Sequence, residues 1–191
     1  FILRIEDTDK AREVEGAIPF IQDSLAWLGI SPDEGVGIGG DYGPYVQSEK
    51  KERYIEVAKE LLANGHAYID TLSEEETQKL RDQAEANKEP FLYRNYRPDT
   101  LHTTYEPGKT VRFKISELKR YTWTDLVRGE LSAGEEALDD FVIIKADGYP
   151  TYNLAHMVDD HDMKITHIMR GEEFISSTPK FLALYEALGY T

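Results

Sequence analysis

The sequence predicts an α/β fold in which a layered domain is interrupted by a smaller α+β insertion. Strand-like runs and amphipathic helices alternate over residues 1–66 and again over residues 151–191. Between them, over residues 67–150, one polar helix and short alternating strands replace that pattern. The first pattern is typical of layered α/β domains, and the second is typical of α+β structure. We therefore expect two segments of one domain on either side of an insertion.

The first segment is expected to form a strand and two helices. The apolar run over residues 1–5 predicts a strand, and a start in mid-strand indicates an internal piece of a longer protein. Apolar residues at helical spacing predict a helix over residues 18–28, which Gly29 ends. A loop rich in glycine and proline follows over residues 32–47, and a second amphipathic helix is expected over residues 48–65.

The insertion is expected to contain one helix and several short strands. Ser73, with Glu76 three residues later, is a capping box that predicts the start of a helix. Alternating apolar residues predict strands, and the Asp-Gly pair at 147–148 predicts a tight hairpin turn. The expected strands cover residues 111–115, a pair within 123–131, and residues 140–145.

The last segment returns to alternating helix and strand. A helix is expected over residues 152–159, followed by a buried strand over residues 164–169 that ends at Arg170. The Thr-Pro pair at 178–179 predicts the start of a final helix, which ends at Gly189.

The composition excludes several classes of protein. The chain has 191 residues, no cysteine, and 36 acidic against 22 basic residues, for a formal net charge of −14. Without cysteine there is no disulfide scaffold, thiolate zinc site or cysteine nucleophile. No apolar run reaches the length of a membrane span, so we expect a cytoplasmic protein with no membrane partner. Taken alone, the acidic balance argues against binding nucleic acid.

The charge is distributed unevenly along the chain. Residues 88–128 contain nine basic and five acidic side chains, a net of +4, and the remainder has 13 basic and 31 acidic residues, a net of −18. Aromatic residues are interleaved with the basic ones, a combination suited to phosphate contact and base stacking. The alternative for this block is a solvated strand face, which composition alone slightly favours.

Two charged residues are expected at the same edge of the sheet. Glu6 directly follows the first predicted strand, and Arg170 directly follows the strand predicted over residues 164–169. Ligands of open α/β sheets bind beyond the carboxyl ends of the strands. If the two strands are parallel neighbours, this pair faces one crevice near the Tyr152 hydroxyl and suits the charged groups of an amino acid. The alternative is a structural ion pair at the sheet edge.

The acidic clusters permit a different chemistry. Carboxylates with an occasional imidazole suit magnesium or manganese, so a metal-dependent phosphoryl-transfer enzyme is an alternative function. Ordinary turn and helix-cap chemistry also explains these residue types. The candidate metal ligands are Glu6, Asp7, Asp9, Asp159, Asp160 and His161.

Six short motifs follow one another along the chain. They are RIEDTD (4–9), GPYVQSE (43–49), DGYPTYNLA (147–155), VDDH (158–161), RGEE (170–173) and STP (177–179). In this combination and order the sequence resembles the catalytic region of the bacterial glutamyl-tRNA synthetases, which are class I aminoacyl-tRNA synthetases. The resemblance extends over nearly all 191 residues, so it is far more specific than any single motif.

The resemblance implies a fold and its division into parts. The fold is a class I Rossmann-type catalytic domain, present incompletely and formed by residues 1–66 and 151–191. Residues 67–150 are its inserted connective-peptide subdomain, which in the family packs on the acceptor end of tRNA. These boundaries agree with those read from composition.

The resemblance also implies substrate-binding residues. Glu6 corresponds to the residue that binds the ammonium group of glutamate, Tyr152 to one that lines the glutamate pocket, and Arg170 to the ligand of the side-chain carboxylate. His156, one turn after Tyr152, stands where some relatives carry a small polar pocket residue. Glu173 is expected near ATP or the adenylate. The residues implied to contact the tRNA acceptor end are Asp9, Arg12, Arg112 and Lys114.

The implied reaction joins L-glutamate to tRNA for glutamate in two steps, through glutamyl-adenylate formed from ATP. Magnesium accompanies the ATP, no zinc is expected, and no covalent protein nucleophile is needed, because positioning and charge stabilisation drive this chemistry. The full-length protein is expected to be a monomer. The family's HIGH-type and KMSKS-type signatures are absent from the chain, so this piece is not expected to activate glutamate by itself.

Three alternatives stay open beside this interpretation. A glutaminyl-tRNA synthetase, or the short paralogue that charges a modified base in tRNA, shares the fold, although Arg170 suits a carboxylate better than a neutral amide. The metal-dependent phosphoryl-transfer enzyme is a second alternative, from another class. A third is a non-catalytic interaction module.

Overall fold

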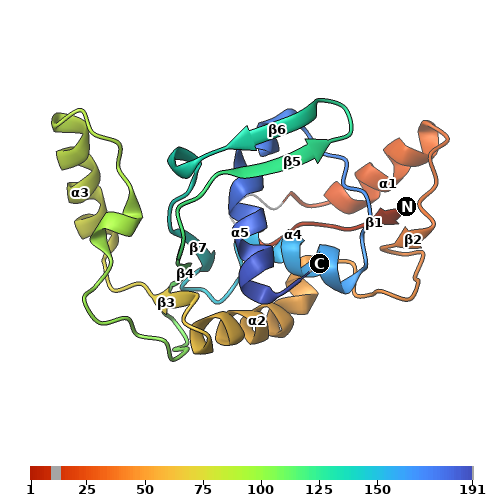
Figure 1. The fold of residues 1–191 in the computed structure, drawn as a ribbon. Coiled ribbons are helices and arrows are strands. Elements are labelled where there is room, and N and C mark those ends of the chain that lie inside the picture. Colours follow the sequence, from red (N-terminus) through yellow and green to blue (C-terminus); the bar gives the residue numbers. More distant parts are fainter. Residues whose placement is uncertain (10–13, 191) are drawn as a thin grey trace.

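The computed structural model describes residues 1–9 and 14–190. Over these residues it contains five α-helices and seven strands (Figure 1). The helices are α1 (Ala17–Trp27), α2 (Lys51–Ala63), α3 (Glu74–Ala86), α4 (Tyr152–Asp162) and α5 (Thr178–Leu188). The strands are β1 (Ile2–Leu3), β2 (Glu34–Gly35), β3 (Ala67–Ile69), β4 (Val111–Phe113), β5 (Tyr121–Asp125), β6 (Gly129–Ala133) and β7 (Phe141–Ile144). No helix in the described ranges combines the length and apolar character needed to cross a membrane.

The strands form three small sheets. β1 pairs in parallel with β2, and the isolated parallel bridge between Ile5 and Val46 continues this pairing toward the site. β3, β4 and β7 form an antiparallel sheet in that order, and β5 and β6 form an antiparallel hairpin. The predicted strand pair within 123–131 is therefore confirmed. The predicted turn at 147–148 is also present, because Gly148 adopts φ +81° and the Lys145 amide donates to the Tyr149 carbonyl over 2.9 Å.

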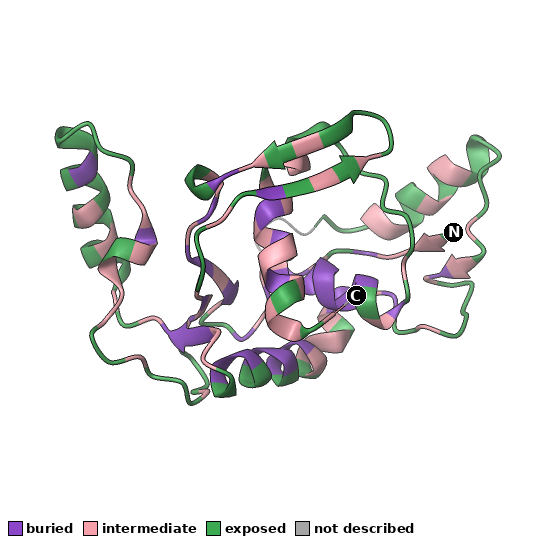
Figure 2. Ribbon diagram, viewed as in Figure 1, coloured by how far each residue is buried: buried purple, intermediate pink, exposed green. Residues whose placement is uncertain are grey.

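One continuous core joins the antiparallel sheet to three helices. α2 buries one face and exposes the other, as Figure 2 shows, because its apolar residues recur at helical spacing. Its buried side chains pack in the same cluster as residues of β3, β4 and β7 and of α4 and α5. The sheet of the predicted insertion thus shares a core with helices from both flanking segments. The division into residues 1–66, 67–150 and 151–191 stays a prediction.

Two helices contribute little to that core. α1 has no buried residue, and Trp27 at its end is 86% exposed. α3 lies at one end of the molecule, away from α4 and α5 (Figure 1). Its predicted capping box is confirmed, since Ser73 Oγ accepts the Glu76 amide over 3.2 Å and Glu76 Oε2 accepts the Ser73 amide over 2.8 Å.

A buried carboxylate ties the first segment of the chain to α4. The Asp159 side chain is fully buried and accepts hydrogen bonds from Lys50 Nζ at 2.6 Å, the Tyr54 hydroxyl at 2.9 Å and Gln47 Nε2 at 2.9 Å. These donors come from α2 and from the 3-10 turn η2 (Gln47–Lys50) that precedes it. The next residue, Asp160, accepts from Arg4 Nη1 at 2.7 Å. The chain after β1, the start of α2 and the second half of α4 are therefore held together by ionic hydrogen bonds.

A second buried carboxylate organises the antiparallel sheet. Asp140, just before β7, accepts the Tyr68 hydroxyl of β3 at 2.9 Å, the Ile115 amide at 2.9 Å and two Arg97 donors at 2.6 and 2.7 Å. Since buried carboxylates are tolerated when they are paired and hydrogen-bonded, this residue can link segments distant in sequence.

The strand predicted over residues 164–169 is wrong. These residues are irregular and largely exposed, and Met169 has 95% of its surface accessible. The apolar pattern is typical of a buried strand, but a strand also needs a neighbour to complete its backbone hydrogen bonds. Within the described residues the partner of β1 is β2, and the sheets include no strand after β7. The Thr-Pro pair at 178–179 also predicts Thr178 as the cap of the last helix, but Ser177 is the cap and the helix begins at Thr178.

We predict that Asp159→Ala lowers the free energy of unfolding of the full-length protein by ~3–5 kcal/mol, because buried cations and a tyrosine lose their common partner. The matched control is Asp162→Ala on the same helix, whose carboxylate pairs with Arg53 at 2.9 Å near the surface and should contribute about 1 kcal/mol or less. Urea unfolding of both variants measures the difference. Equal losses would show that the buried cluster has no special role.

Candidate functional site

A pocket of about 310 Å³ lies between the end of the first strand and the start of α4. It brings together three residues that the sequence predicted, namely Glu6, Tyr152 and Asp9. Most of its surface is apolar, and polar groups such as the Glu6 carboxylate and the Tyr152 hydroxyl are available to orient a ligand. The remaining lining residues are Thr8, Gln47, Lys145, Pro150 and Thr151.

Glu6 is paired with an arginine of its own motif. Arg4 Nη2 lies 3.2 Å from Glu6 Oε1, while the same guanidinium also reaches Asp160. Partial burial raises the pKa of Glu6, and the charge of Arg4 opposes that rise. The alternative of a structural ion pair between Glu6 and Arg170 is therefore not the arrangement found. Glu6 presents a carboxylate at the pocket and is held from behind by Arg4.

Arg170 is held by Tyr152. Its Nη1 donates to the Tyr152 hydroxyl at 2.7 Å, and its guanidinium carbon lies 5.1 Å from the ring centre of Phe181. The guanidinium has five N–H donors, of which this bond uses one. Arg170 is exposed and follows an irregular segment, so Tyr152 supplies the positioning that the predicted strand was expected to give. The structure thus brings Tyr152 and Arg170 into direct contact.

His156 lies behind Tyr152 and is 1% exposed. Its ring stacks on that of Tyr152 with centroids 4.4 Å apart, and its Nδ1 lies 2.6 Å from the Tyr152 carbonyl oxygen. Burial lowers the pKa of His156 from 6.5 to about 3, so the folded protein holds a neutral imidazole. The unfolded chain binds a proton below pH 6.5, so this residue makes stability fall as pH drops from about 6.5 toward 3. His156 is not among the residues that line the pocket.

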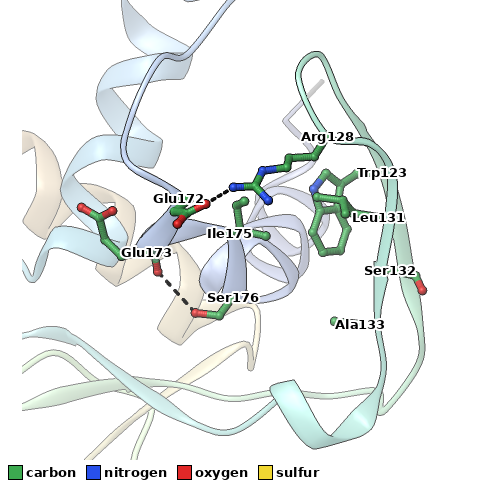
Figure 3. Close-up of a pocket in the computed structure, with 9 residues that line it drawn as sticks. All are labelled: Trp123, Arg128, Leu131, Ser132, Ala133, Glu172, Glu173, Ile175 and Ser176. Carbon is green, nitrogen blue, oxygen red and sulfur yellow. Dashed lines mark hydrogen bonds and ion pairs between the residues drawn. The ribbon is translucent and has the colours of Figure 1, made fainter.

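A larger pocket of about 660 Å³ lies between the β5–β6 hairpin and the 3-10 turn η5 (Glu172–Ser177), shown in Figure 3. Glu173, predicted near ATP, lines this pocket and not the one beside Glu6. Glu172 forms an ion pair with Arg128 across its mouth, whereas the Glu173 carboxylate points away from that arginine (Figure 3). The other walls come from Trp123, Leu131, Ser132, Ala133, Ile175 and Ser176.

The residues proposed as metal ligands have other partners. Asp159 and Asp160 are bound by basic side chains, Asp7 Oδ1 accepts the Ser48 amide at 2.8 Å, and the ring of His161 stacks on Tyr190 at 3.6 Å. Over residues 1–9 and 14–190 no group of three or more histidine or acidic side chains is arranged to hold a metal ion. This arrangement does not support the metal-dependent phosphoryl-transfer alternative.

The predicted tRNA contacts lie in different settings. The Arg112 side chain is 12% exposed, its Nη2 is 2.7 Å from Asp70 Oδ2, and its guanidinium carbon is 3.3 Å from the ring centre of Tyr93. Lys114 follows β4 and is half-buried beside a third, smaller pocket. Arg12 lies outside the described residues. Part of the basic block therefore neutralises internal carboxylates, as Arg112 and Arg97 do, which leaves less of its charge for a nucleic acid.

Sequence reasoning missed Arg4 and Gln47 as residues that build the site. Arg4 stands two residues before Glu6 in the same motif, and that proximity is a local signal of an ion pair. Gln47 reaches Asp159 across 112 residues, so only the fold could identify it.

The fold and the site together define a class of protein. A parallel strand pair, a helix that follows the acidic motif, an antiparallel sheet, and a pocket lined by an acid and a tyrosine fit the catalytic domain of a class I aminoacyl-tRNA synthetase. Arg170 is not among the residues that line this pocket and is connected to it through Tyr152. A family model described as tRNA synthetases class I (E and Q), catalytic domain, matches residues 1–191, and the chain belongs to this family.

Individual relatives agree with this assignment. The chain is 50% identical over 191 residues to a glutamate–tRNA ligase of Dehalococcoides mccartyi (strain CBDB1) and 43% identical over 199 residues to one of Clostridium botulinum (strain Eklund 17B). It covers 39% and 40% of these proteins, and they cover 100% of the chain. A crystal structure of a glutamate tRNA ligase from Elizabethkingia meningosepticum in complex with its amino acid matches the whole chain with TM-score 0.89 and 38% identity, over 40% of its length. The chain therefore spans about two fifths of these relatives.

We predict that Arg112→Ala lowers the free energy of unfolding of the full-length protein by ~2–3 kcal/mol, because the buried carboxylate of Asp70 loses its cation. Lys114→Ala removes four heavy atoms from a half-buried side chain two residues away, and it should change the free energy of unfolding by at most about 0.5 kcal/mol. Thermal unfolding measures both. A larger loss for Lys114→Ala would reverse the structural assignment of the two residues.

Proposed function

We propose that the full-length protein is a glutamate–tRNA ligase. The single observation that carries the proposal is the arrangement around the smaller pocket, where Glu6 and Tyr152 line the wall and Tyr152 holds Arg170. The names of the relatives support it, although the chain spans only about 40% of their length. The substrates and partners are then L-glutamate, ATP and tRNA for glutamate.

The reaction proceeds in two steps. A carboxylate oxygen of glutamate attacks the α-phosphorus of ATP, and pyrophosphate leaves as glutamyl-adenylate forms. A terminal adenosine hydroxyl of tRNA then attacks the acyl carbon, and AMP leaves as the ester forms. Magnesium is proposed to come with the ATP phosphates and to neutralise their charge, because the described residues include no group arranged as its ligands.

The chain's own residues bind and orient the amino acid. The Glu6 carboxylate accepts the α-ammonium group, and Arg4 keeps this carboxylate in place. Arg170 binds the side-chain carboxylate with donors that Tyr152 leaves available, and the buried His156 stacks on the Tyr152 ring. Positioning of this kind lowers the barrier without a covalent protein intermediate.

Other residues are proposed to contact the larger substrates. Glu173 faces the ATP or adenylate region from the second pocket. Asp9, Arg12, Arg112 and Lys114 are proposed for the acceptor end, although the contacts of Arg112 support a structural role for that residue first. The proposed setting is the cytoplasm and the proposed full-length state is a monomer.

Arg170 favours glutamate over glutamine as the substrate. A guanidinium has only donors to offer, which matches a carboxylate with its two acceptor oxygens. A glutamine side chain would place its NH₂ group against one of these donors. The glutaminyl-tRNA synthetase alternative is therefore the less suitable one for this site.

We predict that Arg170→Ala in the full-length enzyme raises the KM for glutamate by about a hundredfold or more while the KM for ATP changes less than about threefold, because only the amino acid loses its ionic partner. Arg120→Ala, which removes an exposed arginine near β5, is the matched control. Initial rates of aminoacylation with glutamate and with glutamine measure the effect. An unchanged KM for glutamate, or a wild-type preference for glutamine, would refute the site assignment.

We predict that Lys114→Glu weakens tRNA binding and makes its dependence on salt shallower by about one or two in the slope of log K against log salt, because a phosphate contact is lost. Lys79→Glu on α3 changes the net charge equally outside residues 88–128 and is the control. Binding titrations from low to high salt measure both slopes. If the Lys114 variant keeps the wild-type slope, the basic block is a solvated face.

A further inference from the structure

Four rings surround the point where Arg170 is held. Tyr152 and His156 come from α4, Phe174 from η5 and Phe181 from α5. The Tyr152 ring lies 5.0 Å from that of Phe174 and 6.3 Å from that of Phe181, and the His156 ring meets Phe181 edge-on at 4.3 Å. The imidazole is thus enclosed between Tyr152 on its face and α5 at its edge. We call these four residues the aromatic cluster.

His156 is the polar member of this cluster and is bound on one side only. The Tyr152 carbonyl oxygen is an acceptor, so the His156 Nδ1 that lies 2.6 Å from it must carry the hydrogen. The other nitrogen, Nε2, is then an acceptor, and it is buried without a hydrogen-bond partner in the described structure.

If the side chain at position 156 only fills space, an imidazole is less favourable there than an apolar ring. An unpartnered buried acceptor is unfavourable, and a phenylalanine would fill a similar volume without that cost. What the imidazole offers in addition is the Nδ1–H bond, which ties its plane to the backbone of the residue on which it stacks. The bond fixes the plane of the imidazole, and the Tyr152 ring stacks on that plane.

The orientation of Tyr152 determines where Arg170 lies. The Tyr152 hydroxyl is the hydrogen-bond partner of Arg170 Nη1, and Arg170 itself is exposed in an irregular segment. A rotation of the ring would move the hydroxyl and release the guanidinium. A restraint on the ring therefore acts on the arginine through one intermediate residue.

We propose that His156 is a positioning residue for recognition of the amino acid, which acts by fixing Tyr152 so that the Tyr152 hydroxyl holds Arg170. The inference rests on the proposed function. It assigns His156 no contact with substrate. The imidazole stays neutral there because it is buried, and because the positive charges of Arg170 and Arg4 oppose its protonation.

The test is a double-mutant cycle in the full-length enzyme. His156→Ala should raise the KM for glutamate by about tenfold, leave kcat within about threefold and leave the KM for ATP unchanged. Tyr152→Phe should raise the KM for glutamate by a similar factor. Since both act through the same hydroxyl, the double variant should be no worse than Tyr152→Phe alone within about threefold.

Two further variants make the cycle decisive. Met157→Ala creates a cavity in the core from the adjacent residue of α4 and should leave the KM for glutamate unchanged. His156→Phe keeps the stacked ring without the Nδ1–H bond, so its KM for glutamate should lie closer to that of the wild type than the KM of His156→Ala does. If His156→Ala does not fold, His156→Phe still tests the inference. It should raise the KM for glutamate by about threefold in the wild-type background and leave it unchanged in the Tyr152→Phe background.

The outcomes separate this inference from the proposed function. A wild-type enzyme that charges no glutamate overturns the proposed function. If the wild-type enzyme charges glutamate, two results overturn the positioning role alone. One is that the effects of His156→Ala and Tyr152→Phe on the KM for glutamate multiply in the double variant. The other is that neither His156→Phe nor His156→Ala changes this KM.

Discussion

The fully buried carboxylate of Asp159 is the constraint on which the site depends. It accepts hydrogen bonds from Gln47, Lys50 and Tyr54, and Arg4 lies close enough to share its charge with Asp159 and Asp160. Removal of this charge from water is unfavourable, so the arrangement is stable only when all partners are in place together. That requirement joins the end of the first strand, the start of α2 and the second half of α4.

The geometry of the smaller pocket follows from this network. Arg4 pairs with Glu6 and α4 carries Tyr152, so both of these lining residues are positioned by elements that the same buried cluster holds together. Arg170 lies outside the network and is held from α4 through Tyr152. A preorganised acid and a guanidinium guided by a hydroxyl fit a site that recognises the two charged ends of one small molecule.

The charge of the chain has to be considered by location. The overall balance is strongly acidic, while residues 88–128 are basic. Within that block, Arg97 and Arg112 pair with the buried Asp140 and Asp70, so they stabilise the antiparallel sheet. The basic side chains that remain available to a polyanion are those that form no ion pair among the described residues, such as Lys114. Neither the total charge of the chain nor the charge of residues 88–128 therefore gives the charge of the surface that a nucleic acid would contact.

Local patterns in the sequence determined most helices, the capping box at Ser73 and the hairpin of β5 and β6, because each depends on residues a few positions apart. The ordered motifs were also sufficient to indicate the family. The tertiary structure decided the rest. Residues 164–169 have a strand's composition but are irregular, since a strand exists only beside a partner. The burial of His156 against Tyr152 and the use of Asp159 as a common acceptor depend on packing between helices or on contacts across more than 100 residues. Spacing along the chain carries no information about such contacts.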